Sequence, residues 1–300
     1  MAVIILWIHS GVKDKNVMNK TWQLLTLKFD KDNLNALMLQ YQAAQYIAMT
    51  GRHLIPQKPD DSNTNMQYIF DRNMLLGNLI DDKYSLGMHL IDSNLHLVDK
   101  QLNSLTTIEI VGKTKEQVFS ELKEALNQQG IDVSKFSQQL HYDIPENGLD
   151  HNGLFLKPKI DYLKENTLYR HNAQIILEDL ASQLKNAEHV GVWPHHFDMG
   201  TYVPLAYEKG NVSKSYGLGW AIPDRMVNEP YFYLSFWSQN KPIDFSKLPK
   251  PDAGEWIREG WNGGVLRLSD ILKEKSSPAQ FELVKAFFSS GLEILNKTGI

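Results

Sequence analysis

The sequence predicts an α+β protein, built mainly from antiparallel sheet with helices packed on it. Two patterns and the overall composition predict this class. Apolar residues recur at helical spacing in four segments, 33–50, 114–129, 166–185 and 277–295. Between these segments lie short runs that alternate apolar and polar residues and are joined by polar turns, which is typical of antiparallel strands. With 22% charged and 42% hydrophobic residues, the 300-residue chain can bury a full core.

Capping residues mark the start of two of these helices. Thr114 and Gln117 form a capping-box pattern, and Gly130 is a suitable stop for the helix that follows. Ser277 followed by Pro278 predicts an N-cap and a proline at the first helical position of the last helix.

The clearest strand pair is a hairpin around Ser93-Asn94. Leu86 and Met88 alternate with polar or small residues, and the strand after the turn continues the same apolar face. His89 and His96 then fall on the non-core face, where we interpret them as surface or second-layer histidines because no carboxylate there supports a metal site. Further strands are predicted at 66–70, 73–76, 106–111, 189–197, 201–207, 215–222 and 231–237.

A stretch rich in Gly, Asn and Pro, 145–159, divides the chain into two halves. We predict an N-terminal α+β half over 1–148 and a C-terminal α+β half over 149–300. Each half reads as helix, about four strands, helix, so a structural pseudo-repeat is one interpretation. A single large domain is the other.

The apolar run from Ala2 to Ile8 also has two interpretations. Its β-branched and aromatic residues favour a buried strand, and the alternative is an upstream extension with Met18 as the initiator. The run lacks a preceding basic region and is far shorter than the ~20 residues of a membrane helix, so we expect no targeting segment and no membrane partner.

The composition excludes several classes of function. The chain has no cysteine, which excludes disulfides, thiolate metal sites and a cysteine nucleophile. The net charge is only −4 and the basic residues are scattered, so nucleic acid is not an expected partner. The glycines around Trp261 match no nucleotide-binding motif, so we expect no nucleotide cofactor. The expected location is cytoplasmic.

The densest group of chemically active side chains is Trp193-Pro194-His195-His196-Phe197-Asp198. Two imidazoles and a carboxylate are suitable ligands for a divalent metal, so His195, His196 and Asp198 are candidate metal ligands. Asp198 and His196 are also the candidate catalytic residues, as an imidazole base and its orienting carboxylate. The other interpretation is a structural His–Asp pair. In either case, Asp198 should accept hydrogen bonds from His196, a tyrosine hydroxyl or backbone N–H groups.

The strand predicted at 231–237 is rich in aromatic residues. Its alternation places two tyrosines, a serine and Trp237 on one face and purely apolar side chains on the other. The first face offers hydroxyls and an indole N–H, which suits a ligand pocket, whereas a sheet covered by helices on both faces is the alternative. The candidate ligand-binding residues are Trp193, His196, Asp198, Tyr231, Tyr233 and Trp237.

The order of these motifs carries a resemblance. A strand ending in His-His-Phe-Asp, the strand Glu229-Pro230-Tyr231-Phe232-Tyr233, the turn at Gly260-Trp261 and a closing helix resemble a family of uncharacterised bacterial proteins of about 300 residues, defined only as a domain of unknown function. The resemblance covers roughly 22–295. It implies no activity or cofactor, and it places more weight on Phe197-Asp198 than on the histidines.

Three functional hypotheses follow. The leading one is an aromatic-lined pocket for a small molecule in the C-terminal half, with Asp198, His196, Tyr231 and Tyr233 as polar anchors. The second is a metal-dependent, hydrolase-like enzyme in which His195, His196 and Asp198 hold a divalent ion that activates water. The third is a non-catalytic interaction or assembly protein that uses its aromatic surface as a homodimer interface. Whether the protein is an enzyme stays open at this point.

Overall fold

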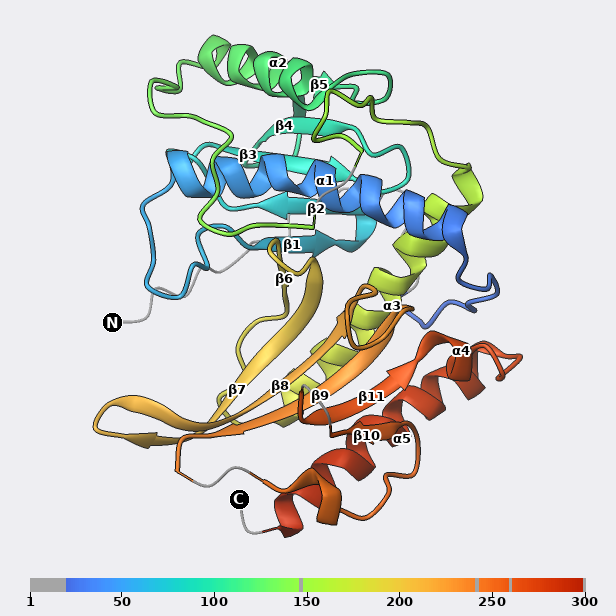
Figure 1. Ribbon diagram of the computed structural model, residues 1–300. Helices are drawn as coiled ribbons and strands as arrows, with labels where there is room; N and C mark the ends of the chain where they lie inside the picture. Colours follow the sequence, from blue (N-terminus) through green and yellow to red (C-terminus); the bar gives the residue numbers. More distant parts are fainter. Residues whose placement is uncertain (1–19, 146–147, 241–242, 259–260, 299–300) are drawn as a thin grey trace.

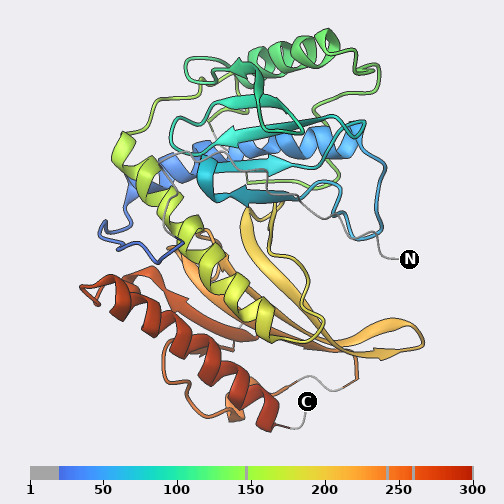
Figure 2. The same cartoon turned by 180° about the vertical axis from the view of Figure 1, so that it is seen from behind.

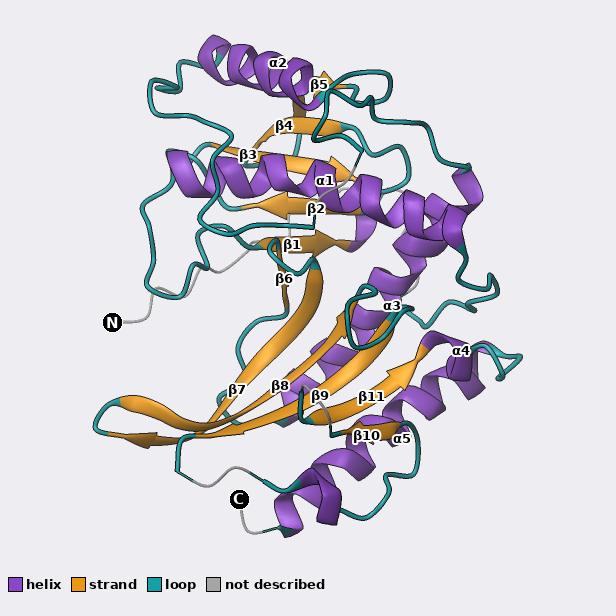
Figure 3. Cartoon of the chain, viewed as in Figure 1, coloured by secondary structure: helices purple, strands orange, loops and turns teal. Residues whose placement is uncertain are grey.

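The computed structural model describes residues 20–145, 148–240, 243–258 and 261–298. The strand predicted at 2–8 and the question of Met18 therefore lie outside the described residues. Within the described residues, eleven strands form one antiparallel sheet in the order β10-β11-β9-β8-β7-β6-β1-β2-β3-β4-β5. Helices and strands are coloured by type in Figure 3. The predicted α+β class with a mainly antiparallel sheet is confirmed.

The N-terminal half contains two long helices and a meander of five strands. Thr114 and Gln117 make both bonds of the predicted capping box, which confirms that helix start. The predicted hairpin is also confirmed, with Leu86 opposite Leu97. The elements are α1 (Lys31–Leu54), β1 (Met66–Ile69), the 3₁₀ turn η1 (Phe70–Arg72), β2 (Met74–Gly77), β3 (Tyr84–His89), β4 (Leu95–Asp99), β5 (Ser104–Ile108) and α2 (Lys115–Gln128).

The C-terminal half again begins and ends with helices. Its first helix starts at residue 160 rather than 166, and the expected strand 189–197 is a three-residue strand followed by a turn. The last helix is capped by Ser276, one residue before the predicted cap. The elements are α3 (Ile160–Gln183), β6 (Gly191–Trp193), β7 (Asp198–Glu208), β8 (Asn211–Ala221), β9 (Tyr231–Ser238), η2 (Phe245–Lys247), β10 (Glu255–Ile257), β11 (Gly263–Arg267), α4 (Leu268–Ile271) and α5 (Ser277–Lys297).

The two halves share the sheet. β6 pairs with β1, and from this junction the strands of each half continue outward in opposite directions (Figure 1). The order helix, strands, helix thus recurs in both halves of the described chain, with five and six strands in place of the expected four. A single cluster of buried apolar side chains extends from Trp22 to Leu295 and therefore joins both halves.

The long helices α1, α3 and α5 cover one face of the twisted sheet. Cross-strand partners share a face, and the succession Met66, Val192, Met199, Trp220, Phe232 is a row of such partners, all buried. In Figure 2, α3 and α5 lie over the rear of β7–β11, whereas the face of β7–β9 turned to the viewer in Figure 1 carries no helix. This helix-free face positions the candidate site.

An extended segment, residues 21–27, lies between α3 and α5. It pairs with side chains rather than with a strand. Asn172 accepts from the backbone N–H of Gln23 at 2.8 Å and donates to its carbonyl at 2.7 Å. Gln280 makes the same two bonds to Leu25, at 2.9 and 2.8 Å. Glu165 accepts from the next two backbone N–H groups. Buried polar side chains thus take the place of a neighbouring strand.

No helix in the described ranges is both long and apolar enough to cross a membrane.

Candidate functional site

The turn between β6 and β7, residues 194–197, carries the predicted histidines. Two of its carbonyls accept hydrogen bonds from α1: Tyr41 Oη donates to His195 O at 2.7 Å, and Gln45 Nε2 donates to Pro194 O at 3.0 Å. Arg170 Nη2 donates to Phe197 O at 2.9 Å. Phe197 has a φ of +53°, a left-handed conformation that costs energy for a residue with a side chain. The three bonds hold the turn in this strained shape.

The Phe197 ring lies between side chains of α1 and α3. The ring of Tyr41 stacks on it at 5.3 Å with an interplanar angle of 14°, and the guanidinium of Arg170 lies 3.8 Å from its centre. Trp220 gives the guanidinium a second aromatic neighbour at 5.1 Å. These contacts connect α1 and α3 to Phe197, the residue that precedes Asp198.

Arg170 is fully buried, and its Nε and Nη1 have no hydrogen-bond partner in the described chain. Burial lowers the pKa of Arg170 to about 9, and the negative charge of Asp198 opposes this shift. The carboxylate of Asp198 therefore stabilises the charged form of Arg170, although the two described side chains make no direct ion pair.

A row of glycines forms the floor of the helix-free face. Gly191, Gly200, Gly219 and Tyr233 are successive cross-strand partners on β6, β7, β8 and β9. A Cβ at Gly219 would lie 2.4 Å from the Tyr233 ring, and one at Gly200 would lie 2.7 Å from the Tyr233 hydroxyl. The absence of these side chains lets Tyr233 extend across β8 toward β7.

Asp198 accepts a hydrogen bond from the hydroxyl of Tyr233. Tyr233 Oη donates to Asp198 Oδ2 at 2.7 Å, so the expected bond from a tyrosine is confirmed. Asp198 Oδ1 is shielded from solvent and has no partner among the described residues. Burial raises the pKa of Asp198, and Tyr233, His196 and His195 offset that shift only in part. A half-satisfied, shielded carboxylate is a feature of binding and catalytic sites.

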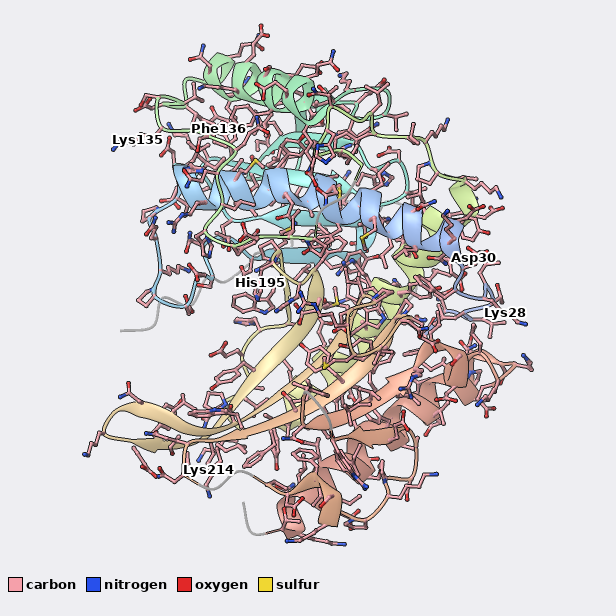
Figure 4. The ribbon with its side chains drawn as sticks, viewed as in Figure 1. Lys28, Asp30, Lys135, Phe136, His195 and Lys214 are labelled. Carbon is pink, nitrogen blue, oxygen red and sulfur yellow. The ribbon has the colours of Figure 1, made fainter. Side chains whose placement is uncertain are left out.

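The two histidines differ in exposure. His195 is half-buried near Tyr142, with ring centres 5.8 Å apart, and Figure 4 places it below α1 where the two parts of the sheet meet. Burial lowers the pKa of His195, and His196 adds to the effect. His196 is exposed, and its ring centre lies 4.5 Å from that of His195.

The predicted three-ligand metal site is wrong as drawn from the sequence. No three His, Asp or Glu side chains of the described residues are arranged to hold a metal ion. His195, His196 and Asp198 therefore do not form such a set. The reason is local: Asp198 Oδ2 already accepts a hydrogen bond from Tyr233 and Oδ1 is shielded from solvent, whereas His196 is exposed.

The remaining predicted residues lie on or near the same face. Trp193 is the cross-strand partner of Asp198 and is half-buried. Trp237 is 50% exposed. Tyr231 is buried, and its hydroxyl donates to Asp224 Oδ2 at 2.7 Å instead of pointing to solvent. Sequence reasoning did not find Arg170, Tyr41, Gln45, Gly200, Gly219 or Asp224.

A separate cavity of about 680 Å³ lies between α1 and residues 148–159. Met38, Leu154 and Phe155 are among its lining residues, and neither Asp198 nor Tyr233 is. The charged Asp32 and Lys159 at its edge pair with each other at 2.9 Å. None of its lining residues is a buried ionisable group.

Comparison with protein families, with curated proteins and with solved structures finds no match to this chain. The resemblance to a family of uncharacterised bacterial proteins therefore stays a prediction.

Proposed function

We propose that the protein binds a small molecule on the helix-free face of β7–β9, with Asp198 and Tyr233 as its polar anchor. The observation that carries the proposal is the shielded Asp198 Oδ1, which lacks a partner in the described chain while Oδ2 accepts from Tyr233. Leaving a shielded carboxylate oxygen unpaired costs about 1–3 kcal/mol or more. A ligand that donates an N–H or O–H to Oδ1 recovers that energy.

The surroundings support a ligand with a flat or apolar body. Gly200 and Gly219 leave the sheet without side chains beside Asp198, and the ring of Tyr233 lies across them. Trp193 stands next to Asp198 on the same face. Aromatic surface next to a single carboxylate is suited to sugars, nucleosides and aromatic amines, which combine donor groups with a stackable or apolar face.

The charge of the site favours a neutral donor over a cation. Arg170 is buried on the opposite side of β7 and already interacts electrostatically with Asp198. The carboxylate is therefore partly compensated within the protein, and the group it needs is a hydrogen-bond donor rather than a second positive charge.

The test begins with a thermal-shift screen of sugars, nucleosides and aromatic amines against the intact chain. Compounds that raise the melting temperature are then titrated by calorimetry into the wild type, Asp198→Asn and Tyr233→Phe. We expect Asp198→Asn to abolish binding and Tyr233→Phe to weaken it by about 10- to 150-fold, since one hydrogen bond to a charged group contributes about 1.5–3 kcal/mol.

The matched control is Tyr216→Phe. Tyr216 lies on β8, but its hydroxyl bonds to Asn296 on the helix-covered side, at 2.9 Å. This variant loses the same hydroxyl and should keep wild-type affinity. Binding that survives in Asp198→Asn would contradict the proposal. So would a dimer in sedimentation analysis that dissociates in Trp237→Ser, because the exposed aromatic face would then be an interface between copies.

A further inference from the structure

A second group of histidines lies in the N-terminal half, on the β3–β4 hairpin. His89 ends β3, and its backbone N–H and carbonyl bond to Asn94 O at 3.0 Å and Ser93 N at 2.7 Å. The turn returns the chain so that His96 on β4 lies diagonally across from His89. Asp92, within the turn, accepts from the backbone N–H of Asn94 at 2.9 Å. The turn is therefore fixed by three hydrogen bonds.

The two imidazoles are neighbours, and one nitrogen of each lies beside an oxygen atom. Their ring centres are 6.4 Å apart, and the rings are almost perpendicular at 85°. His89 Nδ1 lies 3.0 Å from Asp92 Oδ2, an ion-pair contact without hydrogen-bond geometry. His96 Nδ1 lies 3.1 Å from Thr107 Oγ1 on β5. Neither Nε2 has a hydrogen-bond partner within the ranges that the structure describes.

This is the arrangement that metal-binding histidines use. A ligating imidazole typically presents one nitrogen to the metal while the other meets a carboxylate or another oxygen, which fixes the tautomer and the ring direction. The sequence pattern placed no carboxylate on this face, but the turn brings Asp92 to His89. The side chain of His89 is 28% exposed, so an ion can reach the pair from solvent.

We propose that His89 and His96 bind one divalent transition-metal ion, of the zinc, nickel and copper group, through their Nε2 atoms. Asp92 and Thr107 orient the two rings. Imidazole nitrogen suits these three metals, and copper binds most tightly in their common order of affinity. Because no group of three His, Asp or Glu side chains in the described chain can hold a metal, water supplies the remaining ligands.

The geometry needs only a small adjustment. Two Nε2 atoms at about 2.0–2.1 Å from a tetrahedral ion place their ring centres about 5 Å apart. The observed 6.4 Å must therefore shorten by roughly 1 Å, which a modest rotation of two partly exposed side chains provides. The hairpin backbone, held by its ladder and turn bonds, does not have to move.

The experiment is a calorimetric titration of Zn²⁺, and separately of Ni²⁺, into the intact chain without an affinity tag. We expect one site. Asp92→Asn should weaken binding by about 10–100-fold, as loss of an orienting partner does. His89→Ala and His96→Ala should each weaken it further. His53→Ala is the control, because His53 Nε2 bonds to Gln139 O at 2.7 Å and lies on α1.

A readout on the unmutated protein keeps the test independent of folding defects. In histidine NMR spectra, Zn²⁺ should shift the ring signals of His89 and His96 together. Equal affinity in the His89→Ala/His96→Ala double variant would overturn the proposal. Loss of binding in His195→Ala or His196→Ala, with the hairpin variants unchanged, would also overturn it and place the ion at the β6–β7 turn.

Discussion

Arg170 binds Phe197 twice: its guanidinium lies 3.8 Å from the centre of the ring, and its Nη2 donates to the carbonyl of the same residue at 2.9 Å. One side chain of α3 thus fixes both the ring and the backbone of a residue in left-handed conformation. Asp198 follows Phe197 directly in the chain. Through Arg170, α3 therefore helps to position the backbone that carries the Asp198 carboxylate.

Replacement of this side chain should cost stability. Arg170→Met keeps much of the volume but leaves Phe197 O without its donor, so we expect a loss of about 2–3 kcal/mol in the free energy of unfolding. Urea denaturation measures it. The control is Lys159→Met, which removes an exposed cation paired with Asp32 and should cause no comparable loss. Equal stability of Arg170→Met and wild type would show that the bond is dispensable.

The raised pKa of Asp198 predicts a pH dependence. An unfolded aspartate titrates near pH 3.9. The folded protein holds this proton more tightly because of burial, so the contribution of Asp198 to stability is complete below about pH 4 and is lost as the pH rises through the raised pKa.

Asp198→Asn lacks this titration. The difference in unfolding free energy, wild type minus Asp198→Asn, should therefore decrease as the pH rises from 4 toward 8. Urea unfolding of both proteins in half-unit steps measures it. Glu165 and Glu188 are not coupled to Asp198 and therefore cancel in the comparison, whereas His195 interacts with Asp198 and does not. Parallel pH profiles for the two proteins would contradict a raised pKa.

The glycine floor makes a steric prediction. Gly219→Ala places a Cβ 2.4 Å from the Tyr233 ring, and we expect a loss of about 1–3 kcal/mol from overpacking. Gly191→Ala is the matched control on the same row, because its Cβ would meet nothing closer than Asn65 Nδ2 at 3.5 Å. In a Tyr233→Ala background the part of the cost that comes from the ring should vanish, whereas the close approach of the new Cβ to Met199 O at 2.6 Å remains. Additive losses in this double-mutant cycle would mean that Tyr233 does not lie over Gly219.

The β6–β7 turn should open locally when one anchor is removed. Tyr41→Phe deletes the 2.7 Å bond to His195 O, so backbone amides of residues 195–197 should exchange faster, with a stability loss of about 1–2 kcal/mol. Tyr46→Phe removes a hydroxyl from the same helix that bonds to Lys115 O. Hydrogen-exchange mass spectrometry should find the faster exchange at 195–197 in the first variant only.

The sequence predicted best where one local pattern decides the structure. The alternation of Leu86 and Met88 defines the hairpin, and Thr114 with Gln117 defines a helix start, because both depend on residues a few positions apart. The start of α3 was placed six residues late. Its first turns carry Glu165 on a buried position, where it accepts bonds from the segment 21–27, so the apolar periodicity is broken there.

The site was only partly predictable for a related reason. That Asp198 would need a hydrogen-bond donor, from His196, a tyrosine or the backbone, follows from the cost of burying a carboxylate. That the partner is Tyr233 depends on strand register and on Gly200 and Gly219, and these act together only after three strands have paired. Arg170 did leave a signal: it precedes Ala173 and Leu177 at helical spacing, so a charged residue occupies the apolar stripe of α3.

The segment 21–27 has a consequence for the order of events during synthesis. Leu25 bonds to Gln280, 255 residues later in the chain. At 5–20 residues per second, a ribosome needs roughly 13–51 s to add that length. Until α5 has been made, Trp22 and Leu25 cannot be buried against it. The backbone N–H of Leu25 then has only water as its hydrogen-bond partner. Before that point the segment can pair only with Asn172 and Glu165 of α3, so the nascent chain carries a partly paired, strand-like segment until Gln280 has been made.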